Sequence, residues 1–252
     1  MKITFLGTGT SHGIPVINCD CSVCMSKNPK NKRLRASILI ENESNNILID
    51  TSPDFRQQFL SKRIDRIDAV LFTHVHADHI FGLDDLRRFC WIQKERIPIY
   101  GSRDSVKYLK SIFTYAFGVG ELRYGVPNLE ANIINDIFQI GEKKIIPINL
   151  YHGENLIFGY RINNFAYCTD VSKIPEKSYA DLENLDLLVL DSLREKPHPT
   201  HFSLKRAVRE AKKIKAKQTY FTHMNHTLDH DKHGQFLPES IDFAYDGLEI
   251  EI

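Results

Sequence analysis

The sequence predicts an α/β (α+β) fold in a single domain that spans residues 1–252. Short strand-like apolar runs occur in both halves of the chain, and segments with apolar residues at helical spacing lie between them. The length of 252 residues suits one larger domain with a sizeable core. No linker, repeat or low-complexity segment divides the sequence.

The expected strands are apolar runs, and the expected helices carry apolar residues three or four positions apart. The strands are residues 3–6, 37–41, 46–50, 69–72, 97–100, 144–150, 157–162 and 187–190. The helices are residues 55–62, 82–89, 105–117 and 204–214. After the first strand, Gly7 and Gly9 allow a tight turn. A phosphate-binding loop is the weaker interpretation there, because no lysine or helical pattern follows.

Composition limits the classes of function. Hydrophobic residues make up 42% of the chain and charged residues 26%, as in ordinary globular proteins. The net charge of +1 argues against a broad nucleic-acid surface, which needs a clearly basic face. No apolar stretch is long enough to span a bilayer, and the apolar run at residues 3–6 is too short for a signal peptide. We therefore expect a cytoplasmic protein that binds neither nucleic acid nor membrane.

Three histidines and one aspartate follow the predicted strand at residues 69–72. The motif consists of His74, His76, Asp78 and His79. It supplies imidazole and carboxylate donors, which suit zinc and its first-row neighbours. In a turn after a strand, alternate side chains can face one metal while the next pair faces another. The motif therefore predicts a site for two adjacent metals rather than a solvated polar loop.

This motif resembles that of the metallo-β-lactamase superfamily, in which later residues complete the metal site. The matching residues are His152, Asp170 and His223, and each follows an apolar, strand-like run. Their order matches the superfamily pattern along essentially the whole chain. The resemblance implies a metallo-β-lactamase-like four-layer αββα sandwich, which periodicity alone could not show.

A second group of metal-type residues lies near the N-terminus. Cys19, Cys21 and Cys24 are too close together for all three to pair in disulfides. Their spacing fits three corners of a tetrahedral zinc site, with free reduced thiols as the alternative. His226 is the expected fourth ligand, because it lies three residues after the presumed ligand His223. The competitors are His12, His230 and His233.

The cysteine group, together with residues 7–11 and 33–37, resembles the PhnP-like branch of the superfamily. Members of that branch hydrolyse phosphodiesters and carry an additional zinc site. The resemblance therefore implies a metal-dependent phosphodiesterase. Its cofactors would be two catalytic divalent metals, zinc or manganese, and one structural zinc.

The resemblance also implies the metal ligands by position. One metal would be held by His74, His76 and His152, the other by Asp78, His79 and His223, and Asp170 would bridge the two. Two metals about 3.5–4 Å apart would clamp phosphate oxygens and lower the pKa of a shared water.

Asp78 and His201 are the predicted catalytic residues. His201 lies where phosphodiesterases of the superfamily place a histidine that is not a ligand, and we expect it to protonate the leaving oxygen. The alternative is a histidine at a helix start without substrate contact. Asp50 resembles the carboxylate that supports a ligand histidine in the family. A cap for a helix that starts near Pro53 is the alternative for Asp50.

The expected substrate is a small-molecule phosphodiester, cyclic or linear, and a homodimer is one expected assembly. The alternatives are a tRNase Z-like nuclease, a glyoxalase II-like thioesterase and a non-catalytic metal-binding scaffold. The cysteines and residues 199–203 do not belong to the thioesterase pattern. An inserted arm for tRNA is not obvious in the sequence. All seven ligand positions are filled, which argues against an inactive scaffold.

Overall fold

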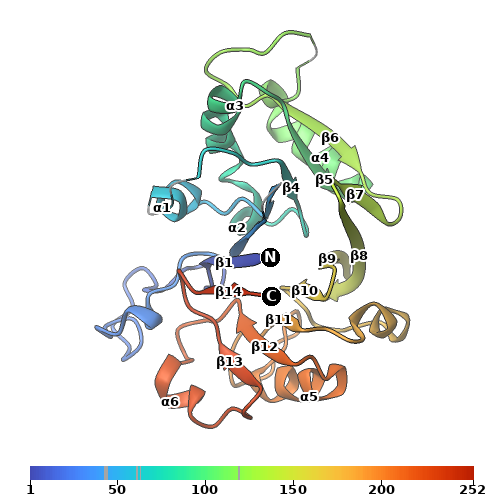
Figure 1. Cartoon of the computed structure of the whole chain (residues 1–252). Helices are drawn as coiled ribbons and strands as arrows, with labels where there is room; N and C mark the ends of the chain where they lie inside the picture. Colours follow the sequence, from blue (N-terminus) through green and yellow to red (C-terminus); the bar gives the residue numbers. More distant parts are fainter. Residues whose placement is uncertain (43–44, 61, 63, 119) are drawn as a thin grey trace.

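Two β-sheets pack face to face through a shared apolar core (Figure 1). The structure is a computed structural model that describes residues 1–42, 45–60, 62, 64–118 and 120–252. Within these residues each sheet has seven strands, and helices cover the outer faces. The predicted four-layer αββα sandwich is therefore confirmed.

The first sheet combines the N-terminal half of the chain with the last strand. In spatial order its strands are β14 (Glu249–Glu251), β1 (Lys2–Gly7), β2 (Ser37–Glu41), β3 (Asn46–Ile49), β4 (Ala69–Leu71), β5 (Ile97–Gly101) and β6 (Leu129–Ile133). The strands from β3 to β6 run parallel. Strands β1 and β14 pair antiparallel, which brings the two ends of the chain side by side (Figure 1).

The second sheet contains strands from the C-terminal half. In spatial order they are β13 (Ile241–Phe243), β12 (Gln218–Thr222), β11 (Leu187–Asp191), β10 (Phe165–Cys168), β9 (Asn155–Ile162), β8 (Lys143–His152) and β7 (Phe138–Ile140). The strands from β10 to β13 run parallel. Strand β8 runs in the same direction, because β8 and β10 are both antiparallel to β9.

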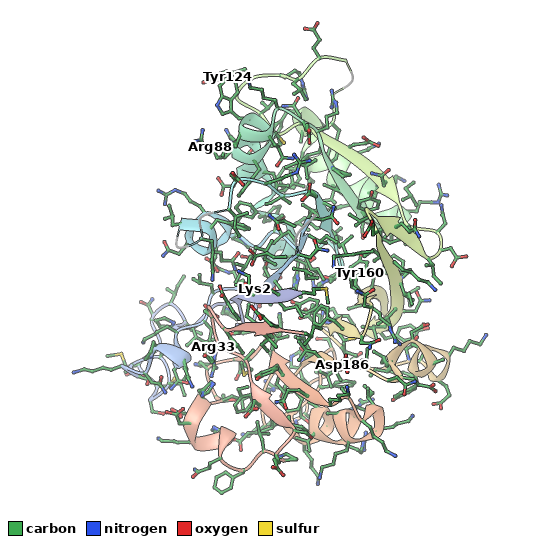
Figure 2. All side chains as sticks on the ribbon, viewed as in Figure 1. Lys2, Arg33, Arg88, Tyr124, Tyr160 and Asp186 are labelled. Carbon is green, nitrogen blue, oxygen red and sulfur yellow. The ribbon has the colours of Figure 1, made fainter. Side chains whose placement is uncertain are left out.

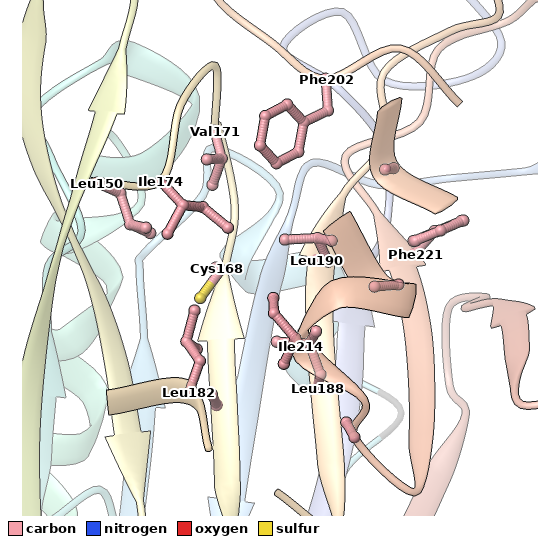
Figure 3. Packing of buried hydrophobic residues seen from close by; sticks show 14 of the residues in the cluster. Leu150, Cys168, Val171, Ile174, Leu182, Leu188, Leu190, Phe202, Ile214 and Phe221 are labelled. Atoms are coloured by element: carbon pink, nitrogen blue, oxygen red, sulfur yellow. The ribbon is translucent and has the colours of Figure 1, made fainter. Parts of the chain in front are cut away.

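The alternation of side chains along the strands sorts the core into layers. In β2, Ile38 and Ile40 point into the core between the sheets, whereas Leu39 packs on the opposite face with the outer helices. This period of two is expected for a strand that is buried on both faces. Figure 3 shows the corresponding outer core of the second sheet, where Leu188 and Leu190 of β11 lie close to Ile214.

The helices are short and lie outside the sheets. They are α1 (Phe55–Leu60), α2 (Ala77–Ile80), α3 (Arg87–Gln93), α4 (Arg103–Ile112), α5 (Leu204–Ile214) and α6 (His230–Gly234). Four 3₁₀ segments occur as well among the described residues: η1 (Pro29–Asn31), η2 (Leu83–Leu86), η3 (Thr114–Ala116) and η4 (Glu176–Leu182). No helix in the described part of the chain has the length and apolar character needed to cross a membrane.

Three predicted helices have different limits in the structure. The helix expected at residues 55–62 corresponds to α1, which ends at Leu60; residue 61 lies outside the described residues, and Lys62 is not helical. The helix expected at residues 105–117 ends at Ile112, because Phe113 leaves the helical backbone region. Its apolar spacing continues into η3, so periodicity alone could not reveal the end. The helix expected at residues 82–89 begins as the 3₁₀ segment η2, and α3 then continues to Gln93.

Two hydrogen bonds join the sheets close to the metal motif. The Tyr160 hydroxyl of β9 donates to the Phe72 carbonyl (2.6 Å), and the Phe158 amide donates to the Thr73 carbonyl (3.0 Å). Figure 2 shows Tyr160 where the upper and lower halves of the molecule meet. The residues directly before His74 are therefore held by both sheets.

Candidate metal centre

The predicted metal-binding residues gather at the carboxyl ends of strands in both sheets. Asp50 follows β3, the His74 motif follows β4, and His152 ends β8. Asp170 and His223 follow β10 and β12. Because carboxyl ends of parallel strands meet at one edge of a sheet, the fold collects residues that are up to 173 positions apart in the sequence, as from Asp50 to His223.

The first group of ligand atoms comes from His74, His76, His152 and Asp170. One ligand atom from each residue lies within 4.8 Å of those of the others. The His74 Nε2 atom is 3.8 Å from the Asp170 carboxylate, and the His76 ring centre is 5.0 Å from that of His152.

The second group comes from Asp78, His79, Asp170 and His223. The Nε2 atoms of His79 and His223 lie 3.3 and 3.4 Å from the Asp78 carboxylate and at the same two distances from Asp170. Asp170 belongs to both groups and places one oxygen toward each. The structure thus brings together all seven residues predicted for the two metals.

The donor set fits divalent metals. The Nε2 atoms of His74 and His79 are buried and have no hydrogen-bond partner in the described structure. Buried polar atoms are normally paired, so these atoms are free to coordinate an ion. Burial and the neighbouring His79 hold the pKa of His74 well below its usual value, which keeps the imidazole neutral. Burial alone would raise the pKa of Asp170, but His223 and His79 hold it well below the usual range.

Supporting hydrogen bonds fix the ligand rings. His79 Nδ1 donates to the Asp50 carboxylate (2.7 Å), which also accepts from the backbone and hydroxyl of Thr73. His152 Nδ1 donates to the carbonyl oxygens of Asp170 and Thr200, both at 2.9 Å. Each contact occupies one ring nitrogen and leaves the other for a metal. Of the two roles left open for Asp50, these contacts favour support of a ligand histidine.

His201 lies beside both groups without belonging to either. Its ring centre is 4.7 Å from that of His152 and 4.9 Å from that of His223. Its Nδ1 contacts the buried Asp191 carboxylate (3.2 Å), which also accepts from the Phe202 amide. Burial lowers the pKa of His201, but the Asp191 charge outweighs this and raises the pKa to about 9. The Asp191 carboxylate therefore favours the protonated form of His201.

Asp191 was missed by the sequence interpretation. It is the last residue of β11 and is fully buried. The signal was present, because a carboxylate at the end of an apolar strand is the same pattern that singled out Asp50 and Asp170. Thr73 and Thr200 were also missed, and they act through contacts that spacing cannot show.

The cysteine group also comes together. The Sγ atoms of Cys19, Cys21 and Cys24 lie 3.1, 3.5 and 3.8 Å from Nδ1 of His226. Zn–S and Zn–N bonds of about 2.3 and 2.0 Å in a tetrahedral site would separate S and N by about 3.5 Å. The donor types and distances therefore suit zinc, and in the described residues His226 completes this group.

The three competing histidines lie elsewhere. His230 contacts Asp231 through Nδ1 (3.0 Å), and His233 Nδ1 accepts from the Asp229 amide (3.0 Å). His12 is exposed and lies on the wall of a pocket beside His201. None of them shares the group formed by the cysteines in the described part of the chain.

An αββα sandwich with two neighbouring histidine and aspartate groups at its strand ends defines a metal-binding protein of the metallo-β-lactamase fold. The chain belongs to the beta-lactamase superfamily, because the sequence profile of the Beta-lactamase superfamily domain matches residues 45–224.

Individual relatives refine this assignment. A crystal structure described as a new diphosphatase from the PhnP family is 44% identical, with a TM-score of 0.94 over 100% of this chain and 96% of that chain. The predicted resemblance to the PhnP-like branch is therefore confirmed. An octanoyltransferase of Porphyromonas gingivalis is 37% identical over 99% of this chain and 51% of its own length. A ribonuclease Z of Rippkaea orientalis is 30% identical over 64% of this chain and 47% of its own length. The chain thus spans about half the length of these two curated relatives.

Proposed function

We propose that the protein hydrolyses phosphodiester bonds in small molecules. The observation that carries the proposal is the pair of His201 and Asp191 beside the two ligand groups. An alkoxide is a poor leaving group and gains from a positioned proton donor. A thiolate leaves readily because the pKa of a thiol is near 8.5, so a thioesterase would not need this pair.

Different residues of the chain have different roles in the proposed reaction. The predicted ligands would hold two divalent metals, which would supply Lewis acidity and make water nucleophilic near neutral pH. Asp50 and the Thr200 carbonyl orient the rings of His79 and His152. Because Asp191 occupies Nδ1 of His201, the Nε2–H group is the one that can donate a proton to the leaving oxygen.

Diphosphate hydrolysis is a second candidate. The structurally similar PhnP-family protein, 44% identical, is described as a diphosphatase. In both reactions water attacks a phosphorus atom and displaces a substituted oxygen, which is an ester oxygen in a phosphodiester and the bridging anhydride oxygen in a diphosphate. The same residues could serve both reactions. A ribonuclease Z-like activity is less favoured, because the matched region covers 64% of this chain and the net charge is only +1.

The remaining parts of the proposal concern cofactors and partners. Zinc or manganese would occupy the two histidine and aspartate groups, and zinc would occupy the cysteine group. The partner is a small phosphodiester substrate, and a homodimer is the proposed assembly.

The experiment uses the metal-loaded protein and compares substrates that differ in the atom of the leaving group. An alkyl phosphodiester, a dinucleoside diphosphate and an acyl thioester would be incubated separately in ¹⁸O-labelled water. We expect ¹⁸O in a phosphate product from the diester or the diphosphate, and little turnover of the thioester. Turnover of the thioester alone would overturn the proposal.

A further inference from the structure

Threonine directly precedes three of the seven predicted metal ligands. The pairs are Thr73 and His74, Thr169 and Asp170, and Thr222 and His223. All three threonines are buried, but their hydroxyl groups have different partners. The Thr73 hydroxyl donates to the Asp50 carboxylate (2.8 Å), and the Thr222 hydroxyl has no hydrogen-bond partner in the described structure. The Thr169 hydroxyl donates to Oδ1 of Asp170 (2.8 Å), the residue that belongs to both ligand groups.

The end of β10 explains why Thr169 lies against Asp170. Side chains alternate along a strand: Cys168 belongs to the outer core (Figure 3), whereas Tyr167 belongs to the core between the sheets. The same period turns Thr169 toward the side of Tyr167. Asp170 has a φ of 58° and leaves the extended backbone, so its side chain stays beside that of Thr169. Two consecutive residues therefore meet through a buried hydrogen bond.

The two oxygens of the Asp170 carboxylate face different ligand groups. Oδ1 lies 3.3 Å from Nε2 of His79 and 3.4 Å from Nε2 of His223. Oδ2 lies 3.8 Å from Nε2 of His74. The orientation of the carboxylate therefore decides whether Asp170 can serve both metals.

The hydrogen bond from Thr169 fixes this orientation. The last torsion of an aspartate side chain is broad, so the side chain alone does not set the rotation of its carboxylate. In the described structure the other close contacts of the two oxygens are with ligand histidines, which a metal would occupy. Without the Thr169 hydroxyl, the carboxylate could turn and bind one metal through both oxygens, because carboxylates bind metals in either mode.

We propose that Thr169 is a positioning residue that holds Asp170 as the bridge between the two metals. The inference rests on the pair of metals in the proposed function. Thr169 acts through Asp170 and is not itself a metal ligand. Its hydroxyl keeps one oxygen toward each group, so its loss should weaken the binding of the second metal more than that of the first.

The test measures metal binding without any substrate. The full chain would be freed of metal with a chelator and titrated with Mn²⁺, which suits carboxylate ligands better than the thiolates of the cysteine group. Electron paramagnetic resonance of the free ion counts the bound Mn²⁺. Two Mn²⁺ ions joined by one carboxylate are magnetically coupled, and their spectrum differs from that of separate ions. For the wild type we expect two bound ions per chain and the coupled spectrum.

Variants assign the effect to the hydroxyl group. Thr169→Val keeps the shape of the side chain and should raise Kd for the second ion about 10- to 100-fold, the usual effect of losing a group that supports a ligand. Kd for the first ion should change little, and the coupled spectrum should disappear. Thr169→Ala should show the same change, whereas Thr169→Ser keeps the donor and should restore wild-type binding. Thr222→Val is the matched control, because Thr222 is also buried next to a ligand but its hydroxyl has no partner in the described structure.

The outcomes that contradict the proposal are distinct. An unchanged Kd for the second ion in Thr169→Val and Thr169→Ala, equal weakening of both ions, or the same loss in Thr222→Val would overturn the positioning role. A wild-type chain that binds fewer than two Mn²⁺ ions would overturn the pair of metals, and this inference with it. Because no substrate enters the titration, absence of phosphodiester hydrolysis would overturn the proposed reaction and leave the role of Thr169 standing.

Discussion

Three residues of the centre adopt the left-handed backbone conformation, which is uncommon for residues other than glycine. Asp50, Asp170 and His223 have φ values of 62°, 58° and 59°. Non-glycine residues in this left-handed region cost of order 1–3 kcal/mol each and concentrate at functional sites. Each of the three comes directly after a strand or one residue later, where the turn directs the side chain toward the other ligands. Side-chain identity was readable in the sequence, whereas this conformation was not.

His201 gives a prediction at the scale of one residue. His201→Ala should slow hydrolysis of an alkyl phosphodiester by about 10²–10⁴-fold, the usual contribution of a positioned general acid. A p-nitrophenyl diester should lose less activity, because its leaving group needs little protonation. Steady-state kinetics with both substrates checks this.

The metal content of the His201→Ala protein shows whether His201 is a proton donor or a metal ligand. Both catalytic metals should stay bound in His201→Ala, since His201 lies outside the two ligand groups. Equal losses for both substrates would assign His201 to phosphate positioning. Loss of metal in elemental analysis would place it among the ligands.

At the scale of elements, local motifs were predictable and long-range supports were not. The residues from His74 to His79 predict a metal site, because four donor residues follow one strand. Asp191 carries the same strand-end signal as Asp50, but its pairing with His201 depends on a loop that returns His201 to the end of β11, and spacing cannot show that contact. Strands such as β14 were missed because a segment of three residues, Glu249–Glu251, is too short to show a strand pattern. It becomes a strand only by pairing with β1.

The cysteine loop gives a prediction at this scale. Cys21→Ser should release one metal per chain and lower the melting temperature, because a metal at this group would tie residues 19–24 to His226. The histidine and aspartate groups should keep their metal. Cys90→Ala is the control, since Cys90 is buried away from the cysteine group and should leave metal content unchanged. An unaltered metal count in Cys21→Ser would remove the cysteines from the ligand set.

At the scale of the whole molecule, buried polar contacts tie the N-terminal loop to the C-terminal segment. Arg33 is 1% exposed and donates to the Asn225 and Leu228 carbonyls (3.1 and 2.8 Å). Figure 2 shows Arg33 where this loop meets the lower half of the molecule. Asp246 accepts from the Thr8 hydroxyl (2.8 Å) and the Leu34 amide (2.6 Å). These contacts span more than 190 positions, so no local sequence pattern could predict them.

Asp246 makes stability depend on pH. Burial raises its pKa to about 7, although the Leu34 and Thr8 hydrogen bonds oppose the rise. Between about pH 4 and pH 7 the folded chain keeps a proton that the unfolded chain has lost. The contribution of Asp246 to the free energy of unfolding therefore falls as the pH rises through this window. In Asp246→Asn, the drop in melting temperature from pH 5 to pH 8 should be smaller than in the wild type.

The exposed Asp65 provides the control for this measurement. Asp65→Asn should keep the wild-type difference in melting temperature between pH 5 and pH 8. The same difference in Asp246→Asn as in the wild type would show that Asp246 does not keep its proton in the folded chain.

The central claim is that two metals joined by Asp170 carry the hydrolysis, and metal titration tests it most directly. Chelated protein would be reloaded stepwise with zinc or manganese in the Cys21→Ser background, which removes the cysteine site. Hydrolysis of bis(p-nitrophenyl) phosphate would be followed against bound metal. We predict no activity without metal, full activity at two metals per chain, and a loss of at least about 10²-fold when Asp170→Ala is added. Turnover by the metal-free protein, or wild-type turnover in a folded Asp170→Ala protein, would contradict the account.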